Sequence, residues 1–219
     1  MLPVNKPKTK KQLMLDILES VYKDTTTALH YSSPFELLIA VVLSAQCTDN
    51  RVNIITARLF PAYNSAEKMA ELSLVELEEL FRDCGLFHSK AKNILATCQI
   101  LIAKHQGQVP STMEELIELP GVGRKTANVL LSQLFGKPAI AVDTHVFRVS
   151  NRLGLAKGKS PEEVKQRLMK AIPKPKWSDA HHWLIWHGRK VCKARNPDCA
   201  ACALKDLCPS KEKIKTTSV

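Results

Sequence analysis

The sequence contains few residues that interrupt helices and no apolar stretch long enough to cross a membrane. Glycine occurs eight times and proline twelve times in 219 residues, and both are dispersed, which leaves no flexible linker or low-complexity tract. The longest apolar run without a charge, Leu37 to Ala45, covers nine residues, whereas a membrane-spanning helix needs about 20. No apolar segment follows the lysine-rich stretch Met1–Lys11, which argues against a secretory signal.

Acidic residues are also scarce relative to basic ones. The chain has 32 Lys and Arg against 21 Asp and Glu, a net charge of +11. This excess favours a polyanionic partner, although a basic soluble protein without such a partner would have the same composition. The seven cysteines are an odd number, which argues against a secreted disulfide framework. Cys47, Cys84 and Cys98 lie in apolar helical stretches and are expected to be buried thiols.

The spacing of apolar residues predicts an all-helical chain. Positions between Leu13 and Val21 recur with helical periodicity, and the stretch from Leu37 to Leu43 is apolar all round, which predicts a helix buried on every side. Only 139–142 is strand-like, and it is too short to build a sheet. Helix starts with capping boxes are expected at Ser33, Ser111 and Ser160, and further helices at about 49–60, 66–71, 74–82, 88–105, 124–135, 144–153 and 178–190.

One glycine-containing turn lies between two predicted helices, with the sequence Leu-Pro-Gly-Val-Gly-Arg-Lys-Thr-Ala at 119–127. Pro120 and Gly121 are expected to end the first helix, and Gly123 permits positive φ or a close backbone approach before the second. Exposed amides at a helix N-terminus bind phosphate independently of base sequence. The pattern therefore predicts a phosphate-binding hairpin, and the alternative is an ordinary connection between helices.

A lysine and an aspartate follow this turn at positions that suit catalysis. Lys125 lies in the first turn of the second helix, where the helix dipole, partial burial and Arg124 would favour a neutral, nucleophilic amine. The alternative is a surface lysine that contacts phosphate. Asp143 is expected to be the N-cap of the next helix. It is either a structural cap only or also a carboxylate that faces the same cleft as Lys125.

Four of the cysteines crowd near the C-terminus in the pattern Cys-x6-Cys-x2-Cys-x5-Cys. Four thiolates suit tetrahedral zinc or a [4Fe–4S] cluster. Zinc sites usually have two close cysteine pairs and this pattern has one, which favours the cluster and leaves zinc as the alternative. Lys193 and Arg195 in the first loop are expected to contact phosphates. The four cysteines are Cys192, Cys199, Cys202 and Cys208.

The hairpin, the Val-Asp-Thr-His segment at 142–145 and the cysteine pattern together resemble the endonuclease III family of the helix-hairpin-helix superfamily. The resemblance runs from about Leu13 to Cys208. It implies an all-α fold with two lobes. One is a six-helix barrel at 27–137 with the helix-hairpin-helix at about 113–132, and the other is a discontinuous domain of 1–26 and 138–219 that holds one [4Fe–4S] cluster.

The resemblance also implies a function in base-excision repair, as a DNA N-glycosylase and abasic-site lyase. A damaged pyrimidine is flipped out of duplex DNA, Lys125 attacks C1′ to form a Schiff base, and β-elimination cuts the strand 3′ to the lesion. Asp143 matches the essential aspartate. Gln46 resembles the residue that fills the gap in the duplex, and Leu86 resembles the wedge that parts the stack. The other expected DNA contacts are Gly121, Gly123, Arg124, Thr144, His145, Lys193 and Arg195.

Three other functions remain as alternatives. A monofunctional glycosylase of the same superfamily generally lacks the lysine and carries an extra C-terminal domain, a non-catalytic DNA-binding module needs neither Lys125 nor Asp143, and a thiol-redox protein would explain only the cysteines. We expect a cytoplasmic, nucleoid-associated monomer that acts on double-stranded DNA and not on membranes. Five further residues have no zinc-binding spacing and are expected in the core: His181, His182, Trp183, Trp186 and His187.

Overall fold

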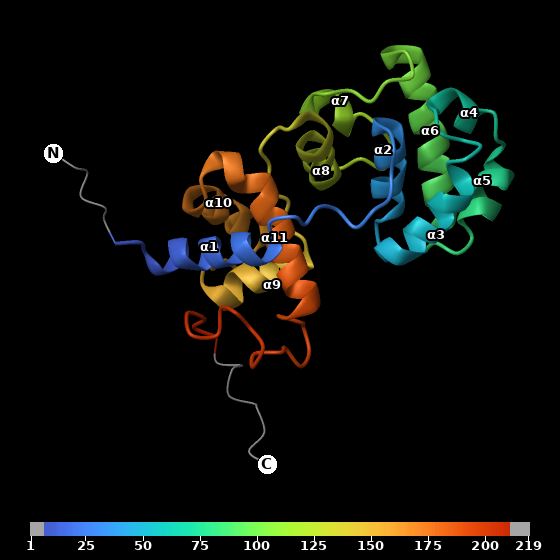
Figure 1. Cartoon of the computed structure of the whole chain (residues 1–219). Coiled ribbons are helices and arrows are strands. Elements are labelled where there is room, and N and C mark those ends of the chain that lie inside the picture. The colour runs from blue at the N-terminus through green and yellow to red at the C-terminus, as the bar shows by residue number, and fades with distance from the viewer. Residues whose placement is uncertain (1–6, 211–219) are drawn as a thin grey trace. The chain divides into compact units, whose positions relative to one another are not determined.

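The computed structural model describes residues 7–210 and contains helices but no β-strand over that range (Figure 1). The all-helical prediction is therefore confirmed. Backbone contacts divide the described chain into two compact units. The internal unit is Thr27–Lys137, and the terminal unit consists of residues 7–26 and 138–210. Predictions for 1–6 and 211–219, including part of the lysine-rich N-terminal stretch, lie outside the described residues.

The internal unit is built around α2, the most apolar helix of the chain. Every residue from Leu37 to Leu43 is at most 8% exposed, which confirms that this helix is buried on every side. It packs against α3, α6 and α8. The helices of this unit are α2 (Pro34–Leu43), α3 (Asp49–Leu59), α4 (Ala66–Ala70), α5 (Leu74–Phe81), α6 (Phe87–His105), α7 (Met113–Ile117) and α8 (Arg124–Phe135).

The terminal unit joins the first helix of the chain to the last. Helix α11 packs against both α1 and α9, and the core between them includes Leu18, Val149 and Leu184. Among residues 7–210, none of the helices is both long and apolar enough to cross a membrane. The helices of this unit are α1 (Lys10–Tyr22), α9 (Thr144–Leu153), α10 (Pro161–Ala171) and α11 (Trp177–Lys190), with a 3₁₀ turn at Lys174–Lys176 that the sequence did not predict.

The helix starts agree with the sequence at two of three positions. The Ser33 and Ser160 hydroxyls accept from the backbone N–H three residues on, as predicted. The prediction for Ser111 is wrong by one residue, because Thr112 offers an equivalent hydroxyl and caps α7. The second half of the predicted box is wrong at both α2 and α10. The Glu36 carboxylate accepts from the N–H and hydroxyl of Ser32, and the Glu163 carboxylate accepts from the N–H of Lys159.

Buried polar and sulfur-containing side chains follow the predictions with two exceptions. Cys84 and Cys98 are buried, but Cys47 lies half-buried in the turn after α2, because α2 ends at Leu43. Trp186 is half-buried and donates its indole N–H to the carbonyl of Thr26 over 2.9 Å. The remaining members of the α11 set are buried, as predicted: His181, His182, Trp183 and His187.

Candidate functional site

The hairpin between α7 and α8 needs glycine at one position only. Gly121 has φ of +81°, and a Cβ there would lie 3.3 Å from atoms of both Asn93 and Val42. Gly123 has φ of −88°, and a Cβ built on it would meet nothing within 4 Å. The expectation of positive φ at Gly123 is therefore wrong, and no other backbone within residues 7–210 approaches it closely. The open space around it leaves room for a ligand at the start of α8.

Packing beneath the hairpin holds it in place. The Thr97 hydroxyl of α6 donates to the carbonyl of Pro120 over 3.0 Å, and the N–H of Val122 donates to the carbonyl of Leu119 over 3.0 Å. Leu119 and Val122 are both buried. Within the described chain, no side chain caps the N-terminus of α8. The first amides of this helix are therefore presented from a rigid base.

Arg124 and Lys125 occupy the first turn of α8 and are both exposed. The predicted partial burial of Lys125 is therefore wrong. The turn places its side chain on the outer surface of the unit, because the inward positions of α8 are taken by Ala127, Leu130 and Leu131. The amine is accessible to a large substrate.

Asp143 is the N-cap of α9, as predicted. Its Oδ1 accepts from the N–H of Val146 over 2.7 Å, and the residue is half-buried. The segment before it is held by His181, whose Nδ1 lies 2.8 Å from the carbonyl oxygen of Ala141. Asp143 belongs to the terminal unit and Lys125 to the internal unit, so their shared cleft stays a prediction.

The two residues after Asp143 differ in exposure. Thr144 is exposed, whereas His145 is half-buried. The Nδ1 of His145 lies 3.2 Å from the guanidinium of Arg148. Burial lowers the pKa of His145, while the charge of Asp143 opposes this and that of Arg148 adds to it. The imidazole is therefore expected to be neutral near pH 7.

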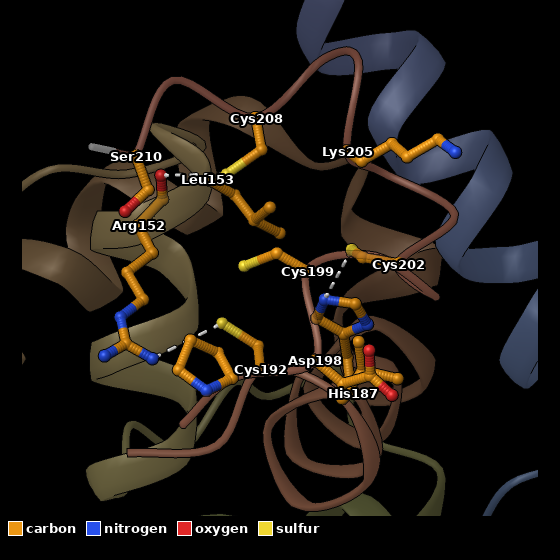
Figure 2. Close-up of a pocket in the computed structure, with 12 residues that line it drawn as sticks. Arg152, Leu153, His187, Cys192, Asp198, Cys199, Cys202, Lys205, Cys208 and Ser210 are labelled. Atoms are coloured by element: carbon orange, nitrogen blue, oxygen red, sulfur yellow. Dashed lines mark hydrogen bonds between the residues drawn. The ribbon is translucent and has the colours of Figure 1, made fainter. Parts of the chain in front are cut away.

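The four C-terminal cysteines line one cavity in the terminal unit, and their sulfur atoms gather around it (Figure 2). The cavity encloses about 390 Å³ of non-atom space, including its opening. Among the described residues, no three His, Cys, Asp or Glu side chains lie close enough to hold one metal ion. Four thiols around a common space are the donor set of a tetrahedral zinc ion or of an iron–sulfur cluster.

Two arginines on α9 support this cysteine segment, and sequence reasoning missed them. The guanidinium of Arg152 donates to the carbonyls of Lys193 over 2.6 Å and Ala194 over 3.1 Å, and lies 3.7 Å from the Cys192 sulfur. Arg148 donates to the carbonyl of Cys192 over 3.1 Å. Arginines four positions apart lie on one face of a helix, and this spacing was the available signal.

A buried histidine on α11 contacts the same cavity. His187 Nδ1 lies 3.1 Å from the Tyr22 hydroxyl, and its Nε2 lies 3.8 Å from the Cys202 sulfur. Burial lowers the pKa of His187 to about 4. Burial, together with the charges of Cys202 and Cys192, raises the pKa of Tyr22 to about 12. Burial also raises the pKa of the Cys192 and Cys202 thiols, so ionisation of these thiols costs free energy. Metal binding to the thiolates would offset that cost.

The loop that follows Cys192 exposes both predicted cations, Lys193 and Arg195. Its turn passes through Asn196 with φ of +49°. The N–H of Asp198 then returns to the carbonyl of Val191 over 3.0 Å. The loop is therefore closed on itself by backbone contacts, and its charged side chains point away from the core.

Gln46 and Leu86 lie on two loops of the internal unit that touch each other. A Cβ on Gly85 would lie 3.2 Å from the carbonyl oxygen of Gln46. Gln46 has φ of +54° and Leu86 has φ of +60°, a left-handed conformation that is uncommon for residues other than glycine. Leu86 is 56% exposed. The structure thus brings these two predicted DNA contacts together.

The chain is similar to known DNA repair proteins. Residues 39–174 match the sequence model of the HhH-GPD superfamily of base excision DNA repair proteins. The chain is 51% identical to endonuclease III of Haemophilus influenzae over 95% of this chain and 99% of that protein. It is 50% identical to endonuclease III of Escherichia coli K12, over 94% and 98% of the two chains.

Solved structures show the same likeness. A trapped endonuclease III–DNA covalent intermediate matches with a TM-score of 0.87 and 50% identity, over 94% of this chain and 99% of that chain. A non-covalent endonuclease III–DNA complex matches with a TM-score of 0.87 and 49% identity, over 94% and 98%. A thermostable thymine-DNA glycosylase, 24% identical with a TM-score of 0.82, shares the fold.

Proposed function

The chain belongs to the endonuclease III family of helix-hairpin-helix base-excision repair enzymes, DNA glycosylases that are also abasic-site lyases, and on this premise we propose its substrate and the roles of its residues. The substrate is duplex DNA with an oxidised pyrimidine or an abasic site. The observation that carries the proposal is the exposed amine of Lys125 in the first turn of α8, directly after the glycine hairpin.

Lys125 acts as the nucleophile. Its amine attacks C1′ of the damaged nucleotide, the bond from C1′ to the base breaks, and the base leaves with the bonding electron pair. The amine and sugar then form a Schiff base. Removal of a proton from C2′ allows β-elimination, which expels the 3′ phosphate and cuts the strand. Because Lys125 is exposed, no protein movement is needed to uncover it.

Asp143 stabilises the positive charge that develops on the sugar as the base leaves. The hydrogen bond from the Val146 N–H to its Oδ1 fixes the carboxylate at the start of α9. A fixed charge stabilises a transition state without the cost of reorganisation. His181 supports this position through the carbonyl of Ala141.

The DNA contacts follow from exposure and charge. The amides near Gly121 and Gly123 bind one phosphate, with Arg124 beside them. Lys193 and Arg195 bind other phosphates, while Thr144 and His145 lie at the start of α9 near the damaged nucleotide. Gln46 fills the gap left by the flipped base, and Leu86 parts the stack. Hairpin amides carry no net charge and read no base, so this binding is independent of sequence.

The four cysteines hold one [4Fe–4S] cluster. When bound, the cluster would cross-link Cys192, Cys199, Cys202 and Cys208 and so fix the loop that carries Lys193 and Arg195. The support is the common cavity of the four sulfurs, together with the adjacent guanidinium of Arg152. Thiolates bound to iron are negatively charged, and a nearby arginine stabilises that charge. We expect the enzyme to work as a cytoplasmic monomer.

Borohydride trapping tests the central step. The wild-type protein, incubated with a duplex that contains one thymine glycol, should form a covalent adduct when the Schiff base is reduced. Lys125→Gln keeps similar length and hydrogen bonding but has no nucleophile, so it should give no adduct while still binding the duplex. Lys68→Gln, on the exposed surface of α4, is the matched control and should trap normally. An adduct formed by Lys125→Gln at the wild-type rate would remove Lys125 from the mechanism.

A further inference from the structure

A lysine and two cysteines meet beneath the loops that carry Gln46 and Leu86. Lys90 of α6 is only 4% exposed. Its ammonium donates to the carbonyl of Leu43 over 2.8 Å and to the sulfur of Cys84 over 3.0 Å. The Cys84 thiol donates to the same Leu43 carbonyl over 3.4 Å. A lysine this deeply buried costs desolvation energy, which these contacts and the negative end of the α2 dipole partly offset.

Cys47 completes the cluster from the neighbouring loop. Its thiol lies near enough to Cys84 to contribute to the raised pKa of that thiol. The backbones of the two loops also touch, because a Cβ on Gly85 would lie 3.2 Å from the carbonyl oxygen of Gln46. Cys47 is half-buried, whereas Cys84 is buried. Cys47 is therefore the more exposed residue of the pair and Cys84 the buried one, the order expected of a sensing thiol and a resolving thiol.

The surroundings of Cys84 differ from those of an ordinary core cysteine. Burial raises the pKa of Cys84, but the hydrogen bond from Lys90 opposes that rise. Cys98 is the useful contrast, because burial raises its pKa to about 12 and the charge of Glu67 raises it further. Lys90 would stabilise the sulfur of Cys84 as its proton leaves. The surroundings of Cys84 therefore favour disulfide formation at this thiol more than those of Cys98 do.

We propose that Cys47 and Cys84 are an oxidation site at which hydrogen peroxide installs a reversible disulfide. The Cys47 thiol loses its proton, its thiolate attacks one peroxide oxygen and the O–O bond breaks. A sulfenic acid forms, and the leaving hydroxide takes up the Cys47 proton to give water. The Cys84 sulfur then attacks the sulfenic sulfur, the S–O bond breaks, and the leaving hydroxide takes the Cys84 proton. The sum is two thiols and one peroxide giving one disulfide and two waters. A low-molecular-weight thiol reverses the reaction by exchange.

The disulfide would tie the loop of Gln46 to the loop of Leu86. This consequence rests on the proposed function, in which both residues enter the DNA. A bond between the two loops would restrict how the wedge and the gap-filling side chain are positioned in the DNA, and small errors of position cost on the order of 10²-fold in rate. Oxidation should therefore slow single-turnover base release by a factor of that order, and reduction should restore the rate.

Peptide mapping of the iron-loaded protein tests the bond itself. The protein is treated with limiting peroxide, free thiols are alkylated, and trypsin digestion follows without reductant. We expect peptide 24–51, which contains Cys47, joined to peptide 83–90, which contains Cys84. The joined species should weigh two hydrogens less than the sum of its parts and separate after addition of dithiothreitol. Cys47→Ser and Cys84→Ser should each abolish it.

The matched control is Cys98→Ser, which removes a buried cysteine of the same unit that is outside the cluster. It should form the joined peptide and lose activity on oxidation like the wild type, whereas Cys47→Ser should keep its activity. Iron content measured in parallel separates this effect from oxidative damage to the C-terminal cysteines, which all variants share.

Several products would overturn the proposal. One is an oxidised Cys47 that is joined to no other residue. Another is a covalent bridge from Cys84 to Lys90, which would block trypsin cleavage after Lys90. A third is a disulfide from Cys47 or Cys84 to Cys98. A joined peptide with no change in base release would overturn the coupling to the loops. Failure of the proposed function is distinguishable, because reduced protein would then give no borohydride adduct whatever the state of these two thiols.

Discussion

The two units hold their exposed functional segments by different means. The hairpin of the internal unit rests on apolar packing, because Leu119 and Val122 within it and Ala127 just beyond it are buried. In the terminal unit, Leu204 is the only buried residue among residues 191–210. That segment is held instead by the arginines of α9 and by short backbone turns. One segment is therefore stable as part of a core, whereas the other needs an additional cross-link.

This difference predicts which unit depends on metal. Apolar burial contributes about 25 cal/mol per Å², and a segment with one buried side chain gains little from it. Structural metal binding supplies free energy that such a segment lacks, because the site forms only in the folded state. The internal unit has its own core and should fold without iron.

The largest expected effect is that of Cys199→Ser. The wild-type protein should be brown and contain about four irons per chain. Removal of one ligand should release the iron, abolish the colour and unfold the terminal unit. The internal unit should keep its structure. Iron analysis and hydrogen exchange of peptides from each unit measure the two outcomes. Cys98→Ser, in the core of the internal unit, should keep its iron. Stoichiometric zinc in wild-type protein purified without oxygen would contradict the assignment.

The next effect concerns chemistry on the terminal unit. Asp143→Asn keeps the shape and the capping ability but removes the charge that would stabilise the sugar cation, so base release should slow by on the order of 10² or more. On a pre-made abasic site, from which no base must leave, the variant should retain more activity. Single-turnover assays on thymine glycol and abasic duplexes compare the two steps. Equal loss on both substrates would instead indicate a purely structural cap or activation of the amine.

Much of the fold could be predicted from the sequence. The buried helix α2 followed from its unbroken apolar run, and the helix boundaries followed from apolar periodicity and caps. The start of α7 was missed because Ser111 and Thr112 offer the same hydroxyl chemistry. Local sequence shows which residues can cap, but the path of the chain decides which one does.

The site was less predictable where tertiary contacts decide the outcome. Gly121, not Gly123, takes positive φ, and Asn93 and Val42 from other helices leave little room for a Cβ there. The support of Arg152 for the cysteine loop spans 41 residues of sequence, and neither residue carries a local signal for the other. The contact of Lys90 with Leu43 spans 47 residues. Such pairings become visible only once the helices are packed.

A smaller effect separates the two proposed modes of phosphate binding. Lys193→Ala and Arg195→Ala each remove a positive charge, so each should flatten the slope of log affinity against log salt by about 0.9 and weaken damaged and undamaged DNA alike. Gly121→Ala distorts the uncharged hairpin, so it should weaken binding with little change in slope. Titrations at several salt concentrations measure both quantities. A change of lesion preference with an intact slope in either cation variant would contradict the phosphate assignment.

The smallest effect is on the pH dependence of stability. Acid should destabilise the terminal unit, and alkali should destabilise the internal unit. In the terminal unit, burial and the charge of His181 lower the pKa of His182 from 6.5 to about 4. The unfolded chain therefore binds the proton first, and this stabilisation is complete above pH 6.5 and is lost as the pH falls toward 4. In the internal unit, burial raises the pKa of Cys98 from 9.0 to about 12. The unfolded thiol ionises first, so that stabilisation is complete below pH 9.0 and is lost as the pH rises toward 12.

Each group contributes at most about 1.4 kcal/mol per pH unit, the value for one proton, and His187, whose pKa burial also lowers to about 4, adds to the acid slope of the terminal unit. Hydrogen exchange of peptides from each unit, measured from pH 4 to 10, should show the terminal unit weakening first in acid and the internal unit first in alkali. His182→Phe should reduce the acid slope of the terminal unit, because the variant has no proton to gain, and Cys98→Ala should reduce the alkaline slope of the internal unit. The slopes are the informative quantity, since either substitution also shifts stability at pH 7 through packing. An acid slope unchanged by His182→Phe would show that carboxylates, and not this buried imidazole, set the acid limit of the unit.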